Sequence, residues 1–165
     1  MSHPDRIEPG PGQESVWDYP RPPRLERTDS VLRVEHAGAV IAETSAAWRV
    51  LETSQPPAFY LPPDDVVVEH LRPNLHHSFC EWKGQASYVD VVVGEVVLPN
   101  AAWTYPSPRP AFAAIRDHLA FYPQLLDACV VDGEQVEPNQ GSFYGGWITS
   151  KVVGPFKGGA GTALW

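Results

Sequence analysis

Eighteen prolines are spread through this chain of 165 residues, and they limit its possible folds more than any other feature. Several stand close together, at Pro56-Pro57, Pro62-Pro63 and in the segment 106–110. Proline has no backbone N–H and breaks the interior of a helix. The sequence therefore excludes long helices over most of its length and favours short strands joined by turns.

Composition indicates one globular domain with a core, because 43% of the residues are hydrophobic and only 19% are charged. The net charge of −8 disfavours nucleic acid and anionic membranes as partners. No apolar run approaches the ~20 residues of a membrane span, and the first residues form no hydrophobic signal region. We therefore expect a cytoplasmic location, with Cys80 and Cys129 as free thiols.

Hairpins and short strands dominate the predicted secondary structure. Leu32, Val34 and Ile41 alternate around a turn at 37–38, and this register places Glu43 on the same apolar face. An acid on such a face lies at an edge, is paired, or has a function. Further strands are predicted over 59–61, 66–71, 76–82, 86–93, 96–98 and 101–105, with another hairpin through Asp132-Gly133.

Two short helices complete the prediction. Ser45 can cap a helix over 45–52, and Pro56 lies just beyond its end. A second short helix is expected over 111–117. The whole pattern, with turn signals about every 8–12 residues, is typical of an all-β barrel or sandwich.

Three parts of the chain differ in composition. Residues 1–24 form a proline-rich arm, residues 25–137 form the core domain, and residues 138–165 combine glycines with aromatic residues. We expect the last part to be an extended strap that packs on the core or on a partner subunit. A homodimer held by this strap is one structural interpretation of the chain.

The stretch 76–93 contains the densest group of chemically useful residues. A turn at Lys83-Gly84 would pair His77 with Asp90 and place Tyr88 and Asp90 on one face of the sheet, with Lys83 at the rim. Such a His–Asp pair could act as an oriented general base, although cross-strand pairs of this kind are commonly structural.

A second group of aromatic residues follows, because Trp103 and Tyr105 also share a face. If the two faces coincide, they form an aromatic-walled pocket for a small molecule. The alternative is that these rings fill a dry β core. The candidate ligand-binding residues are Glu43, Tyr60, Trp82, Lys83, Tyr88, Asp90, Trp103 and Tyr105.

Metal and nucleotide signals are weak. Glu69, His70, His76, His77 and Cys80 do not have the spacing of a zinc site, and there is no Cys-x-x-Cys pair. No Gly-x-x-x-x-Gly-Lys motif occurs. Neither a metal nor another cofactor is therefore predicted.

Several motifs occur together: Pro56-Pro57-Ala58-Phe59-Tyr60-Leu61-Pro62, Cys80-x-Trp82-Lys83-Gly84-x-Ala86-x-Tyr88, Ala102-Trp103-x-Tyr105-x-x-Pro108, and Ala120-Phe121-Tyr122 before Val131-Asp132-Gly133. Over about residues 25–137 the chain resembles an uncharacterised bacterial family, domain of unknown function 427. The resemblance implies one compact all-β domain, with one or two short helices, of the β-tent type, in which two sheets meet over a groove. It also implies a likeness in shape to the ligand-binding domain of cereblon, where aromatic residues cage a small ring.

The family has no established activity, so the resemblance supplies no catalytic residue. Three functions remain open: a binding module for a small polar or ring-shaped metabolite, a small hydrolase or transferase using His77, Asp90 and Lys83 with Cys80 in reserve, and a structural dimer. We favour the binding module.

Overall fold

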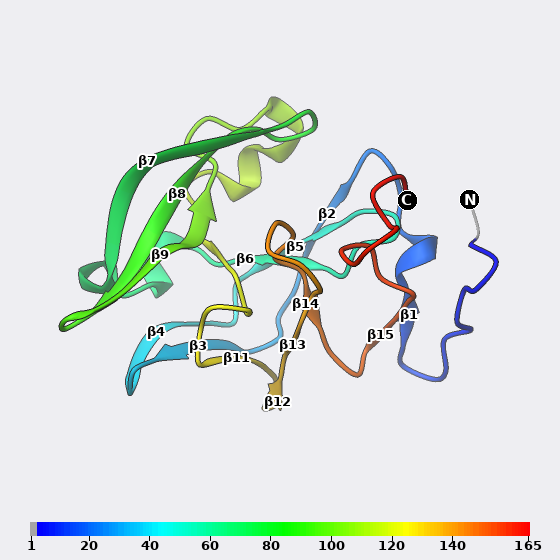
Figure 1. Ribbon diagram of the computed structural model, residues 1–165, viewed down its shortest axis with the longest axis horizontal. Helices are drawn as coiled ribbons and strands as arrows, with labels where there is room; N and C mark the ends of the chain where they lie inside the picture. Colours follow the sequence, from blue (N-terminus) through cyan, green and yellow to red (C-terminus); the bar gives the residue numbers. More distant parts are fainter. Residues whose placement is uncertain (1–2) are drawn as a thin grey trace.

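Two four-stranded antiparallel sheets form the main layers of the structure, a computed structural model that describes residues 3–165 (Figure 1). The first sheet has the order β10-β9-β8-β7, with strands Ala120–Phe121, Val96–Thr104, Gly84–Val93 and Leu71–Cys80. The second has the order β12-β11-β3-β4, with strands Glu134–Gln135, Ala128–Val131, Leu32–His36 and Ala39–Thr44. The domain is all-β and compact, as predicted, and is not a barrel.

A third sheet, in the order β2-β5-β6, runs between these layers in the view of Figure 1. Its strands are Arg24–Arg27, Trp48–Leu51 and Ala58–Tyr60. Two further two-stranded pairs involve the segments near the ends of the chain. They are β1 (Glu14–Ser15) with β15 (Val152–Val153), and β13 (Glu137–Pro138) with β14 (Trp147–Ile148).

Strand β8 separates two apolar clusters because its side chains alternate between the two faces of its sheet. Val89 and Val91 pack in the larger cluster, which also holds Leu32 and other side chains of the second sheet. Ala86 and Tyr88 pack in a second, aromatic cluster. The candidate site lies against this aromatic cluster.

Two of the predicted hairpins are confirmed. The turn between β3 and β4 is Ala37-Gly38, and the turn between β11 and β12 is Asp132-Gly133. All four of these turn residues have positive φ, as a tight two-residue hairpin requires.

The predicted face of Glu43 is wrong. A register shift between Val34 and Glu35 pairs Val34 with Ala42 and Arg33 with Glu43. Ala42 is therefore buried with Val34, whereas Glu43 is exposed and lies 2.7 Å from Arg33 on the outer face. The bulge moves every later side chain of β4 by one position, which the alternation in the sequence did not reveal.

The helix predicted over 45–52 is also wrong, because Trp48–Leu51 is the central strand β5, paired with β2 on one side and β6 on the other. An eight-residue helix is marginal by itself, while pairing on both sides satisfies the backbone of this segment. The second predicted helix is a short 3₁₀ helix, Pro110–Ile115. The strand predicted over 66–71 is likewise replaced, mostly by the 3₁₀ helix Val68–His70.

Within residues 3–165 the remaining helical segments are the 3₁₀ helices Val16–Asp18 and Pro63–Asp65. No helix in this range is long and apolar enough to cross a membrane.

The C-terminal extension packs on its own domain. Trp147 donates from its backbone N–H to the carbonyl of Pro57 at 2.8 Å, and its indole N–H donates to the carbonyl of Phe121 at 3.0 Å. Farther on, Lys157 donates from its backbone N–H to Ser54 at 2.8 Å. The extension therefore crosses the third sheet and reaches the N-terminal arm, where β15 pairs with β1 (Figure 1).

Candidate ligand-binding site

A cavity of about 470 Å³ lies between β6, the turn that joins β7 to β8, the end of β9 and the C-terminal extension. Ligand pockets in proteins are commonly about 300–1,000 Å³. Six of the eight predicted residues line it: Tyr60, Trp82, Lys83, Tyr88, Trp103 and Tyr105. Glu43 and Asp90 do not.

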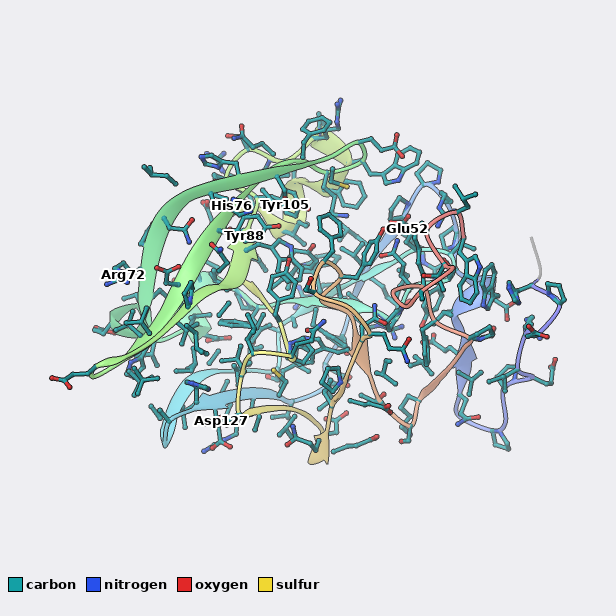
Figure 2. The ribbon with its side chains drawn as sticks, viewed as in Figure 1. Glu52, Arg72, His76, Tyr88, Tyr105 and Asp127 are labelled. Atoms are coloured by element: carbon teal, nitrogen blue, oxygen red, sulfur yellow. The ribbon has the colours of Figure 1, made fainter. Side chains whose placement is uncertain are left out.

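Sheet pairing brings the central rings together. Tyr88 and Trp103 are direct cross-strand neighbours on β8 and β9, and Tyr105 follows two residues after Trp103, on the same face. Figure 2 shows Tyr88 and Tyr105 beneath the ribbon of β7 and β8, with His76 beside Tyr88. The rings of His76 and Tyr88 are 4.5 Å apart between centroids.

Tyr60 joins this group from the third sheet. Trp103 donates its indole N–H to the Tyr60 hydroxyl at 3.2 Å, and the two rings meet edge to face at 6.2 Å. Burial raises the pKa of Tyr60 and of Tyr105 above the ordinary value for a phenol. Both hydroxyls are therefore neutral at physiological pH.

The aromatic rings pack against one another and also border the cavity. The rings belong to a packed cluster, in which the ring centres of Trp103 and Tyr122 are 4.6 Å apart. They also present one side to the cavity. A second hollow of about 440 Å³ adjoins it, and Tyr88 and Tyr122 form part of the wall of both.

Lys83 lies inside the site and not at its rim, where the sequence had placed it. The Lys83 carbonyl accepts a hydrogen bond from the Arg109 N–H at 2.9 Å, and the next residue, Gly84, has φ of +108°. This turn leaves the side chain buried, with its Nζ 5.8 Å from the centre of the Tyr105 ring. A cation over an aromatic face is electrostatically favourable.

The electrostatic environment keeps this ammonium charged. Burial lowers the pKa of Lys83, whereas the neighbouring polar groups of Tyr60 and Cys80, and then the Glu52 carboxylate, raise it. The pKa of Lys83 therefore lies above its ordinary value. The cavity contains a buried positive charge among aromatic walls.

The predicted pair of His77 and Asp90 is not formed. The turn contains Glu81, Trp82 and Lys83, so His77 lies opposite Ser87, and Asp90 lies opposite Arg72 near the far end of β7. His77 is exposed. The expected oriented base is therefore not formed, because the turn lies earlier in the chain, at 81–83, than the turn assumed from the sequence at 83–84.

Asp90 instead stabilises an irregular part of the sheet. It accepts hydrogen bonds from Asn74 Nδ2 at 2.7 Å and from the Asn100 N–H at 3.0 Å, beside the register shift between β8 and β9. These hydrogen bonds, that of Asn100 first, and the nearby Arg72 hold the pKa of Asp90 below its usual value. Its carboxylate therefore has a structural role in the sheet.

Residues of the C-terminal extension form the other wall, and the prediction missed all of them. They are Asn139, Phe143, Tyr144, Gly145, Gly146 and Lys157. Gly145 lies directly against the Trp103 ring, where a Cβ would come within 2.6 Å of Cζ3. The glycine and aromatic composition of this segment was the available signal, but it does not say which surface the segment covers.

The cavity also includes Glu52, Cys80 and Tyr122 from the core domain, which were not in the predicted site. Glu52 is held by Arg21 at 3.2 Å. Figure 2 shows Glu52 on the side of the C-terminal segment. Among residues 3–165 no cluster of three or more His, Cys, Asp or Glu side chains could hold a metal ion.

These features define a small all-β domain with an aromatic cavity, one wall of which is formed by the C-terminal extension. A family model described as "Domain of unknown function (DUF427)" matches residues 24–132, and the chain belongs to this family. No curated protein matches the chain. The matched region contains Lys83 and the rings of Tyr60, Trp82, Tyr88, Trp103, Tyr105 and Tyr122, whereas the wall made by residues 139–157, with Phe143 and Tyr144, lies outside it.

Proposed function

We propose that this protein is a binding module for a small ring-shaped metabolite, held in the aromatic cavity. The observation that carries the proposal is the convergence of Tyr60, Trp82, Tyr88, Trp103 and Tyr105, from separate strands and turns, on one cavity of about 470 Å³. Aromatic contacts add about 0.5–1.5 kcal/mol each beyond the area that they bury. Several such contacts could hold a planar ring.

The cavity also offers polar groups that can orient a ligand. Tyrosine hydroxyls are donors and acceptors, and the ammonium of Lys83 is a charged donor. An apolar wall with a few convergent polar groups is typical of small-molecule sites.

A thermal-shift screen with a metabolite library tests the proposal. At a ligand concentration of about one hundred times Kd, binding stabilises the protein by about 2.7 kcal/mol, or about 5–10 °C for a domain of this size. Two variants then locate the site. Trp82→Ala removes a half-buried wall, and Ala58→Phe fills part of the cavity from β6.

Both variants should lose the shift given by any hit, whereas Trp165→Ala should keep it, because Trp165 lies outside the cavity and packs on Trp17. If the library yields no hit, or if the hits bind Ala58→Phe as well as the wild type, the cavity is not the ligand site.

A further inference from the structure

Lys83 is a buried cation without an anionic partner. Its residue is only 8% exposed, yet among residues 3–165 no carboxylate oxygen lies within 4.0 Å of its Nζ. Its neighbours are the rings of Tyr105 and Phe112, at 5.8 and 5.9 Å, and the thiol of Cys80. Buried charges in proteins are usually paired, because taking an ion out of water is costly.

The acids that line the cavity do not supply this partner. Glu52 is held by Arg21, and Glu81 is exposed in the turn. The opposite wall adds a second cation, Lys157, whose Nζ lies 5.4 Å from the centre of the Tyr144 ring. Two ammonium groups from different parts of the chain therefore border one aromatic space.

We propose that the cavity binds a ring compound with one acidic group, a carboxylate or a phosphate, and that this group pairs with Lys83. The inference rests on the proposed function and adds the chemical class of the ligand. The ring would lie against Trp103 and Tyr105, and the anion would supply the partner that the fold leaves out.

Physical chemistry favours this class over a neutral ring. A hydrogen bond between an ammonium and an anion is shorter and about twice as strong as one between neutral groups. A neutral amide of the same shape can accept a hydrogen bond but leaves the buried charge uncompensated. Lys83 should therefore discriminate acids from their amides.

Three compounds with the same ring test this discrimination: 2-naphthoate, 2-naphthamide and 2-naphthyl phosphate, titrated by ligand-observed NMR. Wild-type protein should bind at least one of the acids about 10- to 100-fold more tightly than the amide, the range expected for a hydrogen bond to a charged group. The preferred acid identifies whether the natural group is a carboxylate or a phosphate.

Variants assign the effect to Lys83. Lys83→Met keeps most of the length of the side chain but removes the charge, and it should reduce this preference about 10- to 100-fold. Lys83→Arg should retain most of it. Lys151→Met is the matched control, because Lys151 is exposed and does not line this cavity. If Lys83→Met does not fold, the comparison of acids with the amide on wild type still decides.

Equal binding of acid and amide, or an undiminished preference in Lys83→Met, would overturn the inference but leave the proposed function standing. The inference is also overturned if neither of the two acids binds. A different result overturns the proposed function: the library screen yields no ligand, or every ligand it yields still binds Ala58→Phe.

Discussion

Trp147 in the C-terminal extension should be one of the most important residues for stability, although it lies outside the matched family region. It is only 1% exposed, and its ring centre lies 5.1 Å from that of Phe59 on β6. Its indole N–H donates to the carbonyl of Phe121 on β10. The side chain therefore ties the extension to two different sheets.

The cost of Trp147→Ala follows from this burial. A buried aromatic side chain removes about 150–250 Å² from water, which at about 25 cal/mol per Å² corresponds to about 4–6 kcal/mol. Measured Trp→Ala substitutions in cores cost about 3–5 kcal/mol. We expect a loss of about 4 kcal/mol in the free energy of unfolding, or roughly 8–16 °C in Tm.

Urea denaturation followed by circular dichroism measures this change, with a single transition if the extension and the core unfold together. Trp147→Phe should cost less, about 1–3 kcal/mol, because it mainly leaves the Phe121 carbonyl without its donor. Trp165→Ala, at a half-buried site, should cost no more than about 1 kcal/mol. A loss below about 1 kcal/mol for Trp147→Ala would refute the view that the extension is integral to the domain.

Three further predictions concern the site and its surroundings. Gly145→Ala should cost about 1–3 kcal/mol in unfolding free energy, measured by the same urea titration, because its Cβ would overlap the Trp103 ring; an unchanged midpoint would show that the wall yields. Because the folded pKa of Asp90 is lowered, its stabilising effect is present above the ordinary pKa of about 3.9 and is lost as pH falls through the folded value. Unfolding free energy below about pH 4 should thus fall less steeply in Asp90→Asn than in wild type, and equal slopes would contradict the assignment. Iodoacetamide should label Cys80 and spare Cys129 in the native protein, since burial raises the pKa of the Cys129 thiol to about 12; mass spectrometry that finds native Cys129 modified would contradict its burial.

Much of the site was predictable because cross-strand geometry is regular. Residues two apart on a strand share a face, so it could be inferred that Trp103 and Tyr105 lie on the same side of the sheet. Turn chemistry was also informative where positive φ is needed, as at Asp132-Gly133. Contacts between aromatic rings on neighbouring strands can be predicted once the order of the strands is known.

Errors arose where the pairing register differs from the one assumed. The bulge near Val34 placed Glu43 outside, and the turn at 81–83, earlier than the assumed 83–84, separated His77 from Asp90. Because side chains alternate along a strand, a shift of one position exchanges the two faces. The sequence contains no local mark of such a shift.

By itself, the sequence determined the class of the fold: prolines forbid long helices, alternation builds strands, and the motifs around Trp82 and Trp103 indicate the family. The tertiary structure alone decided what those strands enclose. In the folded protein Lys83 lines the cavity, Asp90 lies outside it, and the extension forms the wall opposite the aromatic rings. These outcomes depend on contacts between segments far apart in the chain, and such contacts are not determined by local residue preference.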